Sequence, residues 1–130
     1  MRWESNVKDD HTLHAIFKSF KHAVTGLLTA LKFGRNIKVH CGVSLCVIAG
    51  GFYFDVSILE WLVLLIVMSQ VMVVELLNSA IEFVVDLVTP EYHLFAKYAK
   101  DIAAGAVLLS ASVAVVIGII VFLPYILSIK

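Results

Sequence analysis

The stretch ILEWLVLLIVMSQVMVVELLNSAIEFVVDLV, residues 58–88, decides the fold of this chain. It is a nearly continuous run of apolar residues and is therefore predicted to form one long helix. At about 1.5 Å per residue the helix reaches about 46 Å, which exceeds the roughly 30 Å hydrocarbon core of a membrane. The sequence thus predicts a helix that crosses a bilayer and stands out of it at one end.

Four polar side chains interrupt this apolar run: Glu75, Asn78, Glu82 and Asp86. At about 100° per residue they fall within an arc of roughly 80°, so the helix carries one acidic stripe. A charged group at membrane depth raises the free energy of insertion by about 2.5–3.5 kcal/mol. The stripe is therefore expected to serve a structural or functional role. Three interpretations are open from spacing alone: a site for chemistry, an interhelical polar clamp, or a path for ions or protons.

The rest of the chain indicates an all-α membrane protein. Of the 130 residues, 61% are hydrophobic, and the mean hydropathy of +0.96 is too high for a soluble domain of this size. Residues 1–11 are polar and predicted to be mobile, and the length leaves no room for a second domain. Residues 1–130 are therefore predicted to form a single membrane domain, with an amphipathic surface helix at 12–33 and transmembrane helices at 37–54, 58–88 and 96–123.

Basic residues are concentrated near the N-terminus. Seven of the ten Lys and Arg residues precede the first long apolar run, whereas the loop after that run has none. The positive-inside rule then places the N-terminus and the second loop in the cytoplasm. Lysines flank the apolar stripe of residues 12–33, so this helix is predicted to lie in the cytoplasmic headgroup layer. Basic and acidic residues balance at ten each, so the net charge says nothing about nucleic acid.

The acidic stripe and the residues near it match the requirements of phosphoryl transfer. Glu75 lies deepest in the membrane and is a plausible general base. Glu82 and Asp86 offer the carboxylate oxygens that hard cations prefer, and Lys100 and Asp101 open the last helix at the same level. A base, carboxylates for Mg²⁺ and a lysine for phosphate are the parts that this reaction needs. The sequence contains neither a P-loop nor a protein-kinase Gly-rich loop.

Two segments resemble the signature of the bacterial integral-membrane diacylglycerol kinase/undecaprenol kinase family. The first is VELLNSAIE at residues 74–82, followed by Val85 and Asp86, and the second is AKD at 99–101, followed by AAGAV at 103–107. The similarity extends from about Phe17 to Leu127. The resemblance implies a homotrimer of three-span subunits in the bacterial cell membrane. It also implies a lipid kinase that uses ATP as co-substrate and Mg²⁺ as cofactor and phosphorylates a membrane lipid alcohol. The predicted partners are a membrane lipid alcohol, ATP and further copies of the chain, with no nucleic acid.

The resemblance further implies a role for each matching residue. Glu75 would be the catalytic base at the lipid hydroxyl, and Asn78 would hold or orient that substrate-binding region. Glu82 would bind Mg²⁺ and through it the phosphates of ATP, with Asp86 in support. The other ATP-binding positions would be His22, Glu91, Tyr92, His93, Lys100 and Asp101.

Two positions depart from the family pattern. Gly34 stands where the family usually has a metal-binding glutamate, and no acidic residue occurs between Asp10 and Asp55 to replace it. Ala15 stands where the family tends to have an arginine. Because phosphoryl transfer depends on charge stabilisation, the loss of a metal carboxylate is expected to weaken Mg–ATP binding. The sequence therefore leaves open an active lipid kinase, a catalytically weakened or silent subunit, and a small ion or proton conductor.

The acceptor lipid is predicted to be undecaprenol rather than diacylglycerol. The segments ILEW at 58–61 and FLP at 122–124 resemble the Gram-positive branch of the family, which favours undecaprenol. The EYH segment at 91–93 also resembles the diacylglycerol branch, so diacylglycerol kinase is the alternative.

Overall fold

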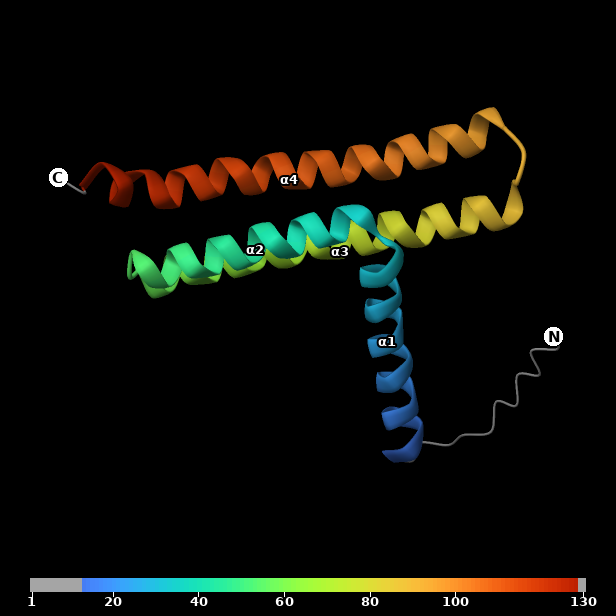
Figure 1. Ribbon diagram of the computed structural model, residues 1–130, viewed down its shortest axis with the longest axis horizontal. Coiled ribbons are helices and arrows are strands. Elements are labelled where there is room, and N and C mark those ends of the chain that lie inside the picture. The colour runs from blue at the N-terminus through green and yellow to red at the C-terminus, as the bar shows by residue number, and fades with distance from the viewer. Residues whose placement is uncertain (1–12, 129–130) are drawn as a thin grey trace.

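The computed structural model describes residues 13–128 as four α-helices joined by short turns (Figure 1). The helices are α1 (Leu13–Phe33), α2 (Arg35–Tyr53), α3 (Ile58–Val88) and α4 (Leu94–Ser128), and no strand occurs in this range. Helices α2, α3 and α4 lie side by side as an elongated bundle, while α1 projects steeply from it where α2 begins (Figure 1). The N-terminal segment predicted to be mobile, residues 1–11, lies outside the described residues.

Helices α3 and α4 form the main contact of the bundle and run antiparallel. Two hydrogen bonds fix their register near opposite ends: Lys100 Nζ donates to Asp86 Oδ1 at 2.7 Å, and Tyr125 Oη donates to Glu60 Oε2 at 2.7 Å. Both pairs align the helices alike, so residues 110 and 111 of α4 lie at the level of Glu75. Helix α2 packs on α3 and makes little contact with α4.

An aromatic cluster holds the helices together beside the turn from α2 to α3. The ring of Phe54 lies 6.0 Å from Phe122 and 5.9 Å from Tyr125, centroid to centroid, and Trp61 packs against the same core. Ser57 caps α3 in a capping box with Glu60, which satisfies two backbone N–H groups at the start of the helix. We call the cluster of Phe54, Glu60, Trp61, Phe122 and Tyr125 the aromatic end.

Two helices differ in length from the sequence-based ranges. Helix α4 was predicted over 96–123 but begins at Leu94 and continues through Pro124 to Ser128. A proline removes one backbone hydrogen bond from a helix; here the bond from Tyr125 to Glu60 anchors the turn that follows it. Helix α2 begins at Arg35 rather than residue 37, because only Gly34 interrupts the helical backbone. Helix α3 occupies its predicted range, 58–88.

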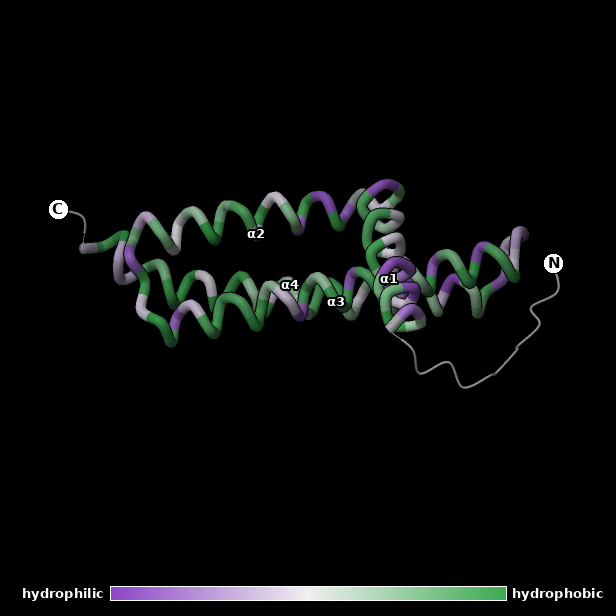
Figure 2. The backbone as a smooth tube through the Cα atoms, turned by 90° about the horizontal axis from the view of Figure 1, so that it is seen from below, coloured by the Kyte–Doolittle hydropathy of each residue, from purple (hydrophilic) through white to green (hydrophobic). Residues whose placement is uncertain are grey.

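The surface of the helices suits a membrane rather than water. Within the described residues, α3 and α4 are long and apolar enough to cross a bilayer; α2, which carries Lys38 and His40, does not meet the same test. Large apolar side chains are exposed along all four helices, and hydrophilic residues gather in α1 and near the ends of α3 and α4 that extend past it (Figure 2). Such extensive apolar exposure is expected of a protein that lipid or other protein chains surround.

Candidate active site

The acidic stripe of α3 is buried at one end and exposed at the other. Glu75 and Asn78 are 2% and 3% exposed, Glu82 is half-buried, and Asp86 is exposed. Glu75 and Asn78 are buried because they continue, at three- and four-residue spacing, the apolar face that packs on the other helices. That face consists of Leu64, Val67, Val71, Glu75, Asn78 and Ser79.

The two buried members of the stripe are incompletely hydrogen-bonded. Asn78 Nδ2 donates to Glu82 Oε1 at 3.4 Å, one helical turn away. Among the residues that the structure describes, Glu75 Oε2 and Asn78 Oδ1 have no hydrogen-bond partner. A buried polar atom without a partner costs about 1–3 kcal/mol, and folded proteins contain few of them. Two acceptor atoms therefore have no partner from within the described chain.

The exposed part of the stripe is paired with charges from α4. Lys100 of α4 donates to Asp86 of the stripe, and a neighbouring pair within α4 joins Lys97 to Asp101. These pairs are solvent-exposed, and such ion pairs typically contribute about 0–1 kcal/mol. Breaking either ion pair consequently requires little free energy. Both lysines can therefore leave their carboxylate and pair with another anion.

Few side chains in this region of the described chain could bind a metal ion. Within residues 13–128 no group of three or more His, Cys, Asp or Glu side chains is arranged to hold a metal ion. Glu82 and Asp86, one turn apart on α3, still offer carboxylate oxygens, the donors that Mg²⁺ prefers. Because Mg²⁺ usually combines one or two carboxylates with water and phosphate oxygens, this donor set fits the ion together with a bound nucleotide.

Position 34, where the family resemblance predicted a metal-binding glutamate, is sterically closed. A Cβ atom on Gly34 would lie 2.6 Å from the backbone oxygen of Ala30 and 3.0 Å from the side chain of Ile37. Ile37 is among the most deeply buried residues of the described chain. The junction of α1 and α2 therefore admits no side chain at position 34 unless its backbone shifts.

The remaining predicted nucleotide-binding residues lie apart from the stripe in the single chain. His22 is exposed on α1, which projects from the bundle, and Glu91, Tyr92 and His93 are exposed in the turn between α3 and α4 (Figure 1). No hydrogen bond or ion pair found in the described part of the chain joins any of them to the stripe. The fold thus brings together Glu75, Asn78, Glu82, Asp86 and Lys100, with Asp101 one residue beyond.

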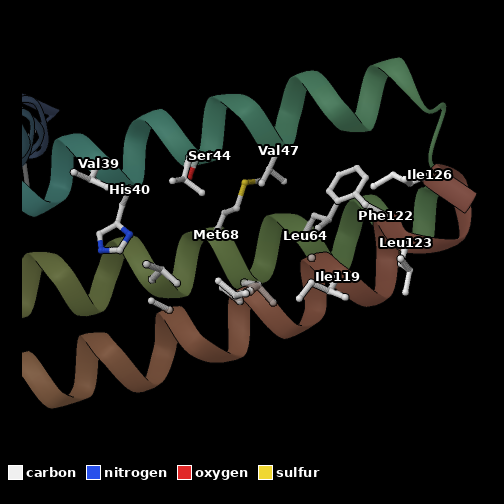
Figure 3. A pocket seen from close by; sticks show the side chains of 17 residues that line it. Val39, His40, Ser44, Val47, Leu64, Met68, Ile119, Phe122, Leu123 and Ile126 are labelled. Atoms are coloured by element: carbon white, nitrogen blue, oxygen red, sulfur yellow. The ribbon is translucent and has the colours of Figure 1, made fainter.

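Two residues near Glu75 were missed from the sequence. His40 of α2 is half-buried and points toward α3, the helix that carries Glu75 (Figure 3). Ser110 of α4 is 8% exposed, lies at the level of Glu75 by the register of the helices, and its Oγ has no hydrogen-bond partner in the described chain. The sequence does show a histidine and a serine inside apolar segments. Spacing along one helix, however, does not reveal which residues of the other helices face it.

A cavity of about 490 Å³ lies beside these residues, between α2, α3 and α4 (Figure 3). Its lining is almost entirely apolar; His40 is the one ionisable side chain among the 17 described residues that line it. Figure 3 shows His40 at one end of the cavity, pointing from α2 toward α3. Phe122 and Ile126 lie at the other end, next to the aromatic end of the bundle (Figure 3).

Comparisons with known proteins bear on the chemistry of this site. A family model described as prokaryotic diacylglycerol kinase matches residues 21–122. The undecaprenol kinase of Bacillus subtilis is 41% identical over 112 residues, which cover 86% of this chain and 91% of that protein. A diacylglycerol kinase of Synechocystis is 42% identical over 111 residues, 85% of this chain and 63% of that protein. The diacylglycerol kinase of Escherichia coli K12 is 44% identical over 64 residues, 49% of this chain and 52% of that protein.

Proposed function

The chain belongs to the prokaryotic diacylglycerol kinase family and is a lipid kinase, and from that premise we propose that it transfers the γ-phosphate of Mg–ATP to the hydroxyl of undecaprenol. The family match agrees with the resemblance that the two sequence signatures indicated. Undecaprenol is favoured because the kinase named for it is 41% identical across 91% of its own length. Diacylglycerol is the second candidate, supported by the Synechocystis relative.

The observation that carries the proposal is the buried Glu75 with its free carboxylate oxygen. Glu75 lies in a helix long enough to cross the membrane, and Oε2 has no partner in the described chain. A lipid hydroxyl can donate a hydrogen bond to this oxygen from within the bilayer. Glu75 takes the hydroxyl proton as the lipid oxygen bonds to the γ-phosphorus; the bond from that phosphorus to the bridging oxygen breaks and ADP leaves.

The exposed half of the stripe is proposed to hold the nucleotide. Asn78 holds Glu82 through their hydrogen bond, and Glu82 and Asp86 would hold Mg²⁺. Bound Mg²⁺ would neutralise charge on the transferred phosphoryl group. Lys100 leaves Asp86 to pair with phosphate oxygens. The nucleotide-contacting set is completed by Asp101, His22, Glu91, Tyr92 and His93.

A three-span subunit in a homotrimer is the proposed arrangement in the bacterial cell membrane. Helix α2 runs alongside α3 (Figure 1), and its 19 residues reach about 28 Å, nearly the thickness of the hydrocarbon core. The exposed apolar face of α1 and the lysines beside it suit the cytoplasmic headgroup layer, with the N-terminus in the cytoplasm. A trimer would bring α1 of one subunit near the site of another and so supply residues that lie apart in one chain.

Mixed-micelle assays with labelled ATP test the proposal. The purified protein is incubated with Mg²⁺ and either undecaprenol or diacylglycerol. We expect phosphate transfer to undecaprenol with a higher kcat/KM than to diacylglycerol, and loss of transfer when EDTA removes the metal. A preference for diacylglycerol would overturn the acceptor assignment.

Absence of transfer to either lipid would instead support the competing interpretation of a weakened or silent subunit, which rests on Gly34. Proton flux into protein-containing liposomes without ATP would support a conductor.

A further inference from the structure

Polar side chains of three helices lie within about one helical turn of the level of Glu75. Val71, which lines the cavity together with His40, lies one turn before Glu75 on the same face of α3. Ala111, which also lines the cavity, is the neighbour of Ser110 on α4. Of the three polar residues, His40 lines the cavity itself, whereas Glu75 lies one helical turn and Ser110 one residue beyond its lining.

Ser110 differs from four other hydroxyl-bearing helical residues of the described chain. Thr25, Thr29, Ser69 and Ser112 each donate to the backbone carbonyl four residues earlier, at 2.7–2.8 Å. This local bond is the usual solution for a helical Ser or Thr in apolar surroundings. The Ser110 hydroxyl is buried yet makes no such bond within the described chain. Its hydrogen-bonding capacity is left for a partner that approaches from outside α4.

The hydrogen-bonding capacities of the three groups are complementary to an alcohol. Glu75 Oε2 is a free acceptor, the Ser110 hydroxyl donates or accepts, and an imidazole N–H donates. An alcohol oxygen carries one proton to donate and lone pairs that accept. An alcohol placed between these groups would satisfy both orphaned atoms at once, whereas a plain hydrocarbon would satisfy neither.

We propose that His40 and Ser110 are positioning residues for the lipid hydroxyl, an inference that rests on the proposed kinase function. Ser110 donates to the hydroxyl oxygen while the hydroxyl donates to Glu75. His40 closes the polar end of the cavity (Figure 3) and offers an imidazole N–H to the same hydroxyl. Neither residue belongs to the acidic stripe, and each contributes from a different helix.

Kinetics of single variants test the two roles. We expect Ser110→Ala and His40→Leu each to lower kcat roughly fivefold to tenfold, the effect of one lost neutral hydrogen bond, with an unchanged KM for ATP. His40→Gln keeps an N–H donor and Ser110→Thr keeps the hydroxyl, so both should recover most of the activity. Ser112→Ala is the matched control, because Ser112 is exposed on the same helix and bonds to its own backbone.

A binding measurement separates failure of this inference from failure of the kinase assignment. Without ATP, undecaprenol should raise the Tm of the wild-type protein more than undecaprenyl acetate does, since the acetate lacks the hydroxyl proton. Ser110→Ala and His40→Leu should lose that difference, and Ser112→Ala should keep it. Active variants that keep both wild-type kcat and the Tm difference would overturn the roles of His40 and Ser110 alone. A wild-type protein that neither transfers phosphate nor distinguishes the two lipids would overturn both proposals.

Discussion

Glu60 and Glu75 are carboxylates on the same helix, yet the fold treats them differently. At the aromatic end, Glu60 Oε2 accepts hydrogen bonds from Ser57 and Tyr125, among packed aromatic rings. Fifteen residues further along α3, Glu75 is more deeply buried and keeps one carboxylate oxygen without a partner in the described chain. One end of the helix is optimised for stability, whereas the other leaves polar atoms unsatisfied.

This contrast indicates where function lies. Unsatisfied buried polar groups are destabilising, and proteins tolerate them mainly at sites that bind or react. The packed aromatic rings and the hydrogen bonds of Glu60 stabilise the bundle at the aromatic end. The region around Glu75 is therefore under less demand to stabilise the fold and is suited to binding a ligand. Substitutions at the two ends should accordingly have different effects. Those at the aromatic end should change stability, and those near Glu75 should change activity.

Apart from Glu75 itself, the largest expected effect comes from Glu82→Gln. Removal of the proposed metal-binding carboxylate should lower kcat/KM for Mg–ATP by about 10²-fold to 10³-fold, since charge stabilisation of this kind is worth several kcal/mol. The Tm in detergent should change little, because Glu82 is half-buried and receives only the long bond from Asn78. Glu60→Gln is the matched control and should leave kcat/KM unchanged. Equal loss of activity in both variants would contradict the claim that only the region near Glu75 serves catalysis.

Trp61→Ala should be the most damaging change at the aromatic end. Removing a packed tryptophan from a core costs about 3–5 kcal/mol, and Trp61 packs against the cluster that joins all three bundle helices. Thermal unfolding in micelles should show a large drop in Tm, while the kcat of the protein that remains folded is kept. Leu59→Ala, at a side chain that is 71% exposed, should have a much smaller effect. A specific loss of kcat at intact Tm would contradict a purely structural role for Trp61.

Substitution of Gly34 should reduce stability by an intermediate amount. The new Cβ of Gly34→Ala would lie 2.6 Å from the Ala30 backbone oxygen, so we expect a loss of about 1–3 kcal/mol from overpacking. Gly42→Ala is the control, because a Cβ there meets no atom within 4 Å and alanine favours the helix. Gly34→Glu introduces the carboxylate that the resemblance predicted at this position but carries the same clash, so its Mg²⁺ affinity is best compared with that of Gly34→Ala. Unchanged stability in Gly34→Ala would show that the junction relaxes freely.

Tyr125→Phe should produce the smallest change. It removes the hydroxyl that donates to Glu60 but keeps the ring in the aromatic cluster. We expect a loss of about 0.5–1.5 kcal/mol, the usual contribution of one hydrogen bond, or up to about 3 kcal/mol if the carboxylate is charged. Kinase activity should be unaffected. A loss of helical content, measured by circular dichroism, would show that the helical turn after Pro124 depends on the hydrogen bond from Tyr125 to Glu60.

Much of the architecture was predictable because a membrane helix must satisfy its own backbone. The apolar run of residues 58–88 set the range of α3, and the turn residues that flank it agree with the structure. The end of α4 was predicted wrongly at Leu123, since Pro124 is normally a terminator and the Tyr125–Glu60 bond is a tertiary contact. Local patterns cannot anticipate such a contact.

The candidate site was predictable only along a single helix. Glu75, Asn78, Glu82 and Asp86 share a face by helical spacing alone, and the bond from Asn78 to Glu82 follows from it. His40 and Ser110 became visible only through the packing of α2 and α4 on α3. The roles of His22 and of the turn at 91–93 stay predictions, because their side chains lie away from the stripe in the single chain.

The most direct test of the account is Glu75→Gln, measured for both activity and stability in the same micelles. Glutamine preserves the shape of the side chain but cannot accept the lipid proton. The account predicts that phosphate transfer to undecaprenol falls by about 10²-fold to 10⁴-fold, while the Tm stays the same or rises because a buried carboxylate is removed. Transfer within a few-fold of wild type, or a collapse of Tm, would instead make Glu75 part of a structural clamp and contradict the account.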